Sequence, residues 1–136
     1  MVRTLMLVLA AAASVAALAP SAAQPPPALA EAQPGLWEIS GAPGAAAPVR
    51  LCLADISALT RFEHRTKSCS AKVVRSAGPV TDIEYSCGPA GFGHSELTVV
   101  TPRSLRISTQ GISDGLPFNY VLQARRVGDC AVPTRH

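Results

Sequence analysis

The stretch CSAKVVRSAGPVTDIEYSC, residues 69–87, decides the fold. When it is folded about Gly78, its two cysteines lie opposite each other. The other cross-strand pairs of this register are Ser70–Ser86, Ala71–Tyr85, Lys72–Glu84, Val73–Ile83 and Val74–Asp82. Because strand side chains alternate between faces, the pairs that contain Tyr85 and Ile83 share an apolar face and the rest a polar one. The sequence therefore predicts an antiparallel hairpin with a strongly specified register.

The chain contains four cysteines, a number that is typical of two disulfides in a short exported protein. The hairpin register pairs Cys69 with Cys87, and elimination then pairs Cys52 with Cys130. A bond that closes a loop of this size stabilises a fold by roughly 3 kcal/mol, mostly by restricting the unfolded chain. The alternative is a zinc site, but the chain has no C-x-x-C pair and its spacings match no common zinc finger.

The N-terminus has the pattern of a secretory signal peptide, which we predict over residues 1–23. A positive charge precedes the apolar run Leu5–Ala19, and Ser21-Ala22-Ala23 offers small residues before a cut at Gln24. The run is short for a membrane span, which needs about 20 apolar residues. A membrane anchor and a cut after Ala30 are the alternatives. The sequence thus predicts a periplasmic or secreted protein without a membrane span after processing.

The charge balance argues against a nucleic-acid partner. The chain has 12 Lys and Arg residues against 9 Asp and Glu residues, and its one basic cluster comprises Arg61, His64, Arg65 and Lys67. Nucleic-acid binding requires a basic stripe with interleaved aromatic residues, and this cluster holds only Phe62. We therefore expect an exposed, solvated loop here, His64 included.

The remaining sequence predicts a Pro- and Ala-rich extended linker at residues 24–33, one domain at 34–131 and a tail at 132–136. Alternation of apolar and polar residues predicts further strands, at about residues 34–39, 49–53, 95–100, 104–110 and 118–127. Together with the hairpin, this gives about six or seven short strands in a single domain.

One short helix and several turns connect these strands. Asp55 can cap a helix from Ile56 to about Phe62. Gly88-Pro89 and Gly91-Phe92-Gly93 together predict one turn, and residues 111–117 predict another. A second hairpin joins the strands at 95–100 and 104–110. Its apolar pattern sets the pairs Leu97–Ile107 and Val99–Leu105.

Because tight loops join neighbouring strands, the predicted fold is mainly β with an antiparallel sheet. Because apolar and polar residues alternate along these strands, the sheet has one apolar face, which must be covered. The sheet either curls into a small partial barrel or is covered by the short helix. The bond Cys52–Cys130 ties the early strands to the end of the last one.

The opening Pro34-Gly35-Leu36-Trp37-Glu38, then Cys52-Leu53, Cys69, Cys87 and Gly128-Asp129-Cys130 form a set of motifs. With this set the chain resembles the small secreted bacterial proteins of the domain-of-unknown-function family DUF3617, over about residues 34–130. The resemblance implies a periplasmic or exported β-rich domain with disulfides. It implies no activity and no cofactor, and therefore no catalytic residue.

A partial resemblance to lipocalins rests on fewer residues. Gly35-Leu36-Trp37 is similar to their G-x-W entry into the first strand, and Arg125 or Arg126 is in a position to lie across the indole. A lipocalin barrel has eight strands around a cavity, and this chain is too short to supply them.

The sequence shows no catalytic constellation. His94 and Ser95 are neighbours on a predicted strand, so their side chains point to opposite faces and cannot form a base–nucleophile pair. Gly91-Phe92-Gly93 lacks the third glycine and the following helix of a nucleotide-binding motif. We therefore predict no catalytic, cofactor-binding or metal-binding residue.

These observations favour a non-enzymatic binding or interaction module of the cell envelope, for an envelope protein or a small apolar ligand. A lipocalin-like carrier and an envelope hydrolase are the alternatives. A cleft that gathers His94 with a carboxylate and a hydroxyl would indicate catalysis. The residues expected to line a ligand pocket, or else a packed core, are Trp37, Tyr85, Phe118 and Tyr120. We expect the packed core, with Trp37 fully buried close to Phe118 or Tyr120.

Overall fold

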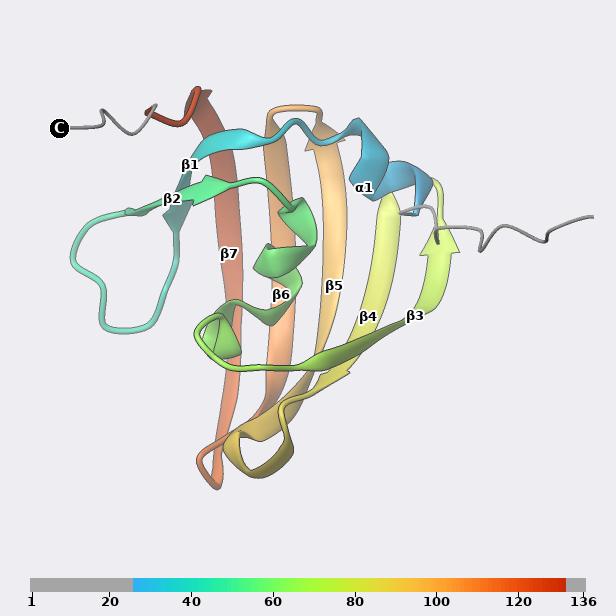
Figure 1. Ribbon diagram of the computed structural model, residues 1–136, viewed down its shortest axis with the longest axis vertical. Helices are drawn as coiled ribbons and strands as arrows, with labels where there is room; N and C mark the ends of the chain where they lie inside the picture. Colours follow the sequence, from blue (N-terminus) through green and yellow to red (C-terminus); the bar gives the residue numbers. More distant parts are fainter. Residues whose placement is uncertain (1–25, 132–136) are drawn as a thin grey trace, which may run out of the picture.

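The computed structural model describes residues 26–131, so the predicted signal peptide and tail lie outside the described residues. Seven strands form one antiparallel sheet in the order β2-β1-β7-β6-β5-β4-β3 (Figure 1). The strands are β1 (Gly35–Ser40), β2 (Val49–Leu53), β3 (Ser70–Ala77), β4 (Val80–Ser86), β5 (Gly91–Thr101), β6 (Ser104–Ser113) and β7 (Leu116–Gly128). The mainly β, antiparallel fold is confirmed. The sheet is open, with β2 and β3 at its edges, so the partial barrel does not form.

The hairpin of β3 and β4 has the predicted register from Ser70–Ser86 to Val73–Ile83. Beyond Val73 a β-bulge inserts one residue, so Arg75 and not Val74 lies opposite Asp82. The bulge brings the Arg75 guanidinium to 2.6 Å from the Asp82 carboxylate. The predicted Val74–Asp82 pair is therefore wrong, because pattern alone does not reveal a single extra residue in one strand.

Both predicted disulfides are present. Cys69 and Cys87 join the open ends of the β3–β4 hairpin, with Cα atoms 4.1 Å apart. Cys52 in β2 is bonded to Cys130, just after β7, with Cα atoms 5.5 Å apart. The second bond therefore holds the short edge strand β2 against the end of the longest strand.

The second hairpin has the predicted pairs Leu97–Ile107 and Val99–Leu105. Its strands are longer than predicted. The predicted turn is present at Gly88-Pro89, as a short 3-10 segment, η2 (Gly88–Ala90). Its predicted continuation through residues 91–93 is wrong, because β5 already begins at Gly91. β6 and β7 meet at Asp114-Gly115, whose φ angles of 47° and 80° suit a two-residue hairpin turn.

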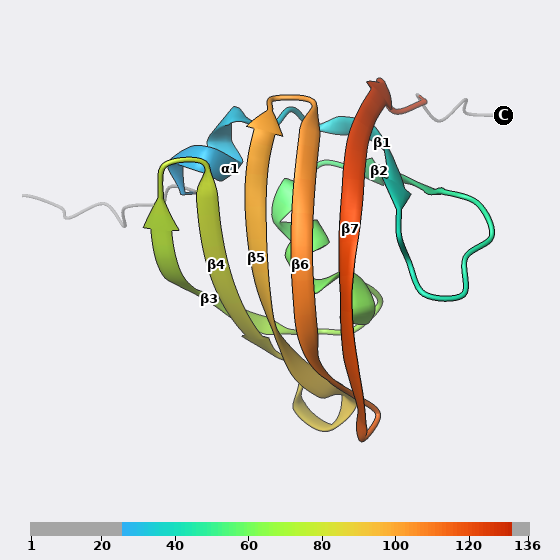
Figure 2. The same cartoon turned by 180° about the vertical axis from the view of Figure 1, so that it is seen from behind.

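Two short helical segments cover one face of the sheet, here called the inner face, whereas Figure 2 shows the opposite, outer face without such a cover. η1 (Ile56–His64) is a 3-10 helix that begins where predicted, because the Asp55 carboxylate accepts a hydrogen bond from the Ser57 backbone N–H. α1 (Pro27–Glu31) lies where an extended linker was expected. The side chains of Ala28 and Leu29 are buried in the core, and this burial stabilises a helix too short to form alone.

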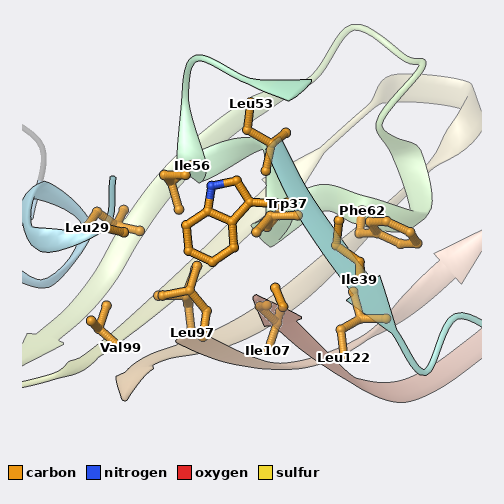
Figure 3. Packing of buried hydrophobic residues seen from close by; sticks show 14 of the residues in the cluster. Leu29, Trp37, Ile39, Leu53, Ile56, Phe62, Leu97, Val99, Ile107 and Leu122 are labelled. Atoms are coloured by element: carbon orange, nitrogen blue, oxygen red, sulfur yellow. The ribbon is translucent and has the colours of Figure 1, made fainter. Parts of the chain in front are cut away.

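The core lies between the inner face and these two segments (Figure 3). Trp37 is fully buried among apolar side chains that include Leu97 and Ile107, as predicted. Its indole N–H donates a hydrogen bond to the Gln33 carbonyl at 3.0 Å. The predicted proximity to Phe118 or Tyr120 is wrong. β1 pairs with the far end of β7, where Trp37 lies opposite Arg126.

Candidate functional site

A hollow of about 890 Å³ opens on the outer face, across strands β3 to β7. We call it the outer hollow. Most of its lining residues occupy the strand positions that alternate away from the core, among them Lys72, Glu84, Phe92, His94, Gln110 and Ile112. The volume lies within the range of ligand pockets in proteins, about 300–1,000 Å³.

The floor of the outer hollow contains a cross-strand pair of glycines, Gly93 of β5 and Gly111 of β6. A Cβ atom on Gly93 would come within 2.5 Å of the Tyr85 hydroxyl, and one on Gly111 within 3.0 Å of the Phe118 ring. A side chain at Gly93 would collide with the Tyr85 ring, and one at Gly111 would collide first with the backbone of Phe92 and Gly93, so glycine is required at both positions.

The lining of the outer hollow is apolar on one side and polar on the other. Phe92 lies opposite Ile112 across the β5–β6 pair, and its side chain is 56% exposed. His94 lies between Glu84 of β4 and Gln110 of β6. Adjacent strands thus bring a small apolar patch next to several hydrogen-bonding groups.

A second hollow of about 210 Å³ adjoins the first and shares His94 and Gln110 with it. Two of its buried polar atoms, His94 Nε2 and Asp82 Oδ1, have no hydrogen-bond partner among the described residues. The other oxygen of Asp82 accepts a hydrogen bond from Arg75 at 2.6 Å. A buried polar atom without a partner costs about 1–3 kcal/mol, so a ligand that supplied the missing contacts would bind favourably here.

The smaller hollow also gathers Glu96 and Ser108, and so combines a histidine, carboxylates and a hydroxyl. Catalysis needs more than this gathering. No hydrogen bond joins Ser108 to His94 in the described part of the chain, and both lie on strands paired on both sides. The backbone N–H groups of such strands are engaged in the sheet, which leaves no free donors for an oxyanion. Residues 26–131 contain no group of three or more His, Cys, Asp or Glu residues placed to hold a metal ion.

Three of the four predicted pocket residues meet on the inner face. The ring centre of His64 is 5.5 Å from that of Tyr85 and 5.9 Å from that of Phe118, and Phe118 in turn lies 5.8 Å from Tyr120. Tyr85 and Phe118 also line the outer hollow, whereas Trp37 and Tyr120 do not, so the four residues do not share one pocket. The aromatic group is close-packed and extends the core toward the far end of the sheet.

His64 is buried at 3% exposure, so the expectation of an exposed loop histidine is wrong. Its Nδ1 lies 3.1 Å from the Tyr85 hydroxyl and its Nε2 lies 3.1 Å from the Ala90 carbonyl. The sequence signal for its burial was available, since His64 continues the helical spacing of Ile56 and Thr60, which are also buried.

Burial also changes the acidity of the two tyrosines. It raises the pKa of Tyr85 to about 12. It raises the pKa of Tyr120 further, and the hydrogen bond from the Tyr120 hydroxyl to the Glu63 carboxylate, at 2.7 Å, acts in the same direction. Both hydroxyls therefore keep their protons at neutral pH, and that of Tyr120 donates to the Glu63 carboxylate.

A groove of about 590 Å³ lies on the inner side of the sheet, between α1, η1 and the edge strand β3. Its lining includes Leu29, Ile56 and Val73. It differs from a lipocalin cavity, because the centre of the inner face is filled by the core. The arginines expected across the indole make other contacts: Arg125 binds Glu38, and Arg126 binds the Pro34 carbonyl.

The match to a known family covers most of the described chain. Residues 32–130 match the family described as "Protein of unknown function (DUF3617)". The chain belongs to this family. No curated protein and no solved structure matches it.

The motifs that carry the DUF3617 resemblance are structural in this protein. Trp37 is a core residue, the cysteines form the two disulfides, and Glu38 binds Arg50 and Arg125. None of these residues lines the outer hollow. Over the described residues, no helix of this DUF3617 member has the length and apolar character needed to cross a membrane.

Proposed function

We propose that this DUF3617 protein is exported and acts as a non-enzymatic binding module of the cell envelope, with its ligand in the outer hollow. The observation that carries the proposal is the hollow itself. It places the exposed Phe92 next to convergent polar groups, the combination that is typical of ligand sites.

The disulfides support export, and the burial of α1 helps to choose the cleavage site. Disulfides persist in oxidising compartments such as the periplasm, and this chain has two. Of the two cleavage sites, a cut before Gln24 leaves α1 intact, whereas a cut after Ala30 would remove the buried Ala28 and Leu29. We expect a mature N-terminus at Gln24, to be checked by N-terminal sequencing of the exported protein. A soluble product that retains Met1 would contradict export.

The ligand site is tested by native mass spectrometry of the protein purified from the envelope. Ser86 lines the outer hollow, so Ser86→Trp should fill it. Thr98→Trp is the matched control, because Thr98 is also on the outer face but does not line the hollow. We expect a small-molecule adduct on the wild type and on Thr98→Trp, and none on Ser86→Trp. A wild type without an adduct, or an adduct that survives in Ser86→Trp, would contradict the proposal.

Carriage of an apolar ligand is the second candidate, and the inner groove is the observation that favours it. Val73 on its wall is 43% exposed although it faces the inner side. If the adduct survives in Ser86→Trp and is lost in Val73→Glu, the inner groove is the site. Hydrolysis is not favoured, because the smaller hollow lacks a nucleophile hydrogen-bonded to a base.

A further inference from the structure

We infer that the ligand of the outer hollow is a neutral saccharide; this inference rests on the proposed function and specifies its ligand class. Three properties of the hollow carry it: the balance of charge, the kind of hydrogen-bonding groups, and an exposed aromatic ring beside them.

The charge of the lining is balanced. Lys72 of β3 lies directly opposite Glu84 of β4, and both line the hollow. An anionic ligand such as a phosphate would meet Glu84, and a cationic ligand would meet Lys72. Since like charges brought together weaken binding, the lining favours a ligand without net charge.

Most of the polar groups in the lining can both donate and accept hydrogen bonds. They are the hydroxyls of Ser70 and Ser86, the amides of Gln110 and Asn119, and the imidazole of His94. Sugar hydroxyls have the same dual character, so one ring can satisfy several of these groups at once. The Nε2 atom of His94 has no hydrogen-bond partner among the described residues.

The apolar part of the lining fits the other side of a sugar ring. Phe92 presents an exposed ring next to Ile112, surrounded by polar groups. The C–H groups on one face of a pyranose are weakly positive and suit the negative face of an aromatic ring. A fatty acid would cover Phe92 but would remove water from the surrounding amides and hydroxyls without replacing their hydrogen bonds, which is unfavourable.

The test is a titration of the full mature protein, followed by the backbone amide signals in NMR spectra. The probes are a tetramer of N-acetylglucosamine, a linear glucose oligomer, inorganic phosphate and dodecanoate. We expect saturable shifts with at least one of the sugars at residues 92–94 and 110–112, and none there with phosphate or dodecanoate. Phe92→Ala should weaken sugar binding about tenfold. Leu116→Ala, which removes an exposed apolar side chain outside the hollow, should leave it unchanged.

Each outcome has a separate consequence. Shifts in the outer hollow with dodecanoate or phosphate but with neither sugar would overturn the saccharide inference and leave the proposed function standing. Sugar binding that Phe92→Ala does not weaken would also overturn it. If no probe shifts the hollow, the saccharide inference fails, while the adduct on the purified protein still decides the proposed function.

Discussion

The two faces of the sheet are built from the same strands but differ in how their polar groups are used. His94 and Ser95 are consecutive residues of β5. Ser95 points inward, is fully buried, and its hydroxyl donates to the Thr60 carbonyl and contacts the Thr109 hydroxyl at 2.8 Å. His94 points outward, and its buried Nε2 has no partner among the described residues. Polar groups on the inner face thus stabilise the fold, while the outer face keeps hydrogen-bonding capacity free.

The contrast has one exception. The hydroxyl of Thr81 is on the inner face, is fully buried and has no partner in residues 26–131. Nothing in the structure explains it. The other buried polar side chains on the inner side, Thr60, His64, Ser95 and Thr109, are hydrogen-bonded. The outer face, which is not packed against the core, is therefore the face on which a ligand site is expected.

The largest expected effect on stability comes from removing the disulfide that holds β2 against the end of β7. Cys52–Cys130 spans 78 residues and Cys69–Cys87 spans 18. Because the longer loop restricts the unfolded chain more, the double change Cys52→Ser, Cys130→Ser should lower the free energy of unfolding by about 4–5 kcal/mol, and the other pair by about 3 kcal/mol. Urea denaturation measures both. Equal losses, or the reverse order, would contradict this account.

Trp37→Ala tests the inner face directly. We expect a loss of about 3–5 kcal/mol in the free energy of unfolding, because a large, fully buried side chain leaves a cavity. The matched change on the outer face, Phe92→Ala, should alter stability by less than about 0.5 kcal/mol. Similar losses in the two variants, measured by chemical denaturation, would show that the faces do not differ as described.

Removing a single hydroxyl from each face, at Ser95 and at Ser108, compares the stability of the two faces again. Ser95→Ala leaves the Thr60 carbonyl and the Thr109 hydroxyl with one partner fewer in the core, and should cost about 1–3 kcal/mol. Ser108→Ala, on the outer face, should change the free energy of unfolding by no more than about 0.5 kcal/mol. Thermal unfolding of the two variants is the measurement, and a neutral Ser95→Ala would sink the idea.

The smallest expected effect is the contribution of Tyr85 to the pH dependence of stability. The folded-state pKa of Tyr85 is raised to about 12, above the usual value of about 10, so the folded state holds this proton more tightly. Its contribution to stability is therefore present below pH 10 and is lost as the pH rises from 10 to 12. Tyr85→Phe should cost about 1 kcal/mol at pH 7, since the contact with His64 is lost. It should also flatten the alkaline decline in stability. An unchanged decline would contradict the assignment.

Local pattern was sufficient for much of the fold. Cysteine spacing and alternation predicted both disulfides and most of the register of two hairpins. Local pattern was not sufficient where a single extra residue changes the register of a strand or the length of a turn. The bulge after Val73 and the two-residue turn at Asp114-Gly115 are such cases. The Asp-Gly pair is a known signal for this turn, so the second could have been found.

The candidate site was less predictable than the fold. Its residues come from five strands, and nothing in the sequence marks Phe92, Gln110 and Asn119 as neighbours until the strand order is known. The sequence also predicts a turn at residues 91–93, whereas Phe92 and Gly93 belong to β5 and line the hollow. The polar residues around His64 predict exposure, whereas its helical spacing from Thr60 indicates the burial that the structure shows.

The approximate strands, the two hairpins, the disulfides and the family could all be predicted from the sequence, because they depend on residues close in the chain or on four cysteines with few pairings. Tertiary structure decided which face is covered, that Trp37 lies opposite Arg126 and far from Phe118, and that the outer hollow exists. The physical reason is that alternation along a strand defines two faces but does not state which strands become neighbours. That choice depends on the packing of η1, α1 and β1 over the whole sheet.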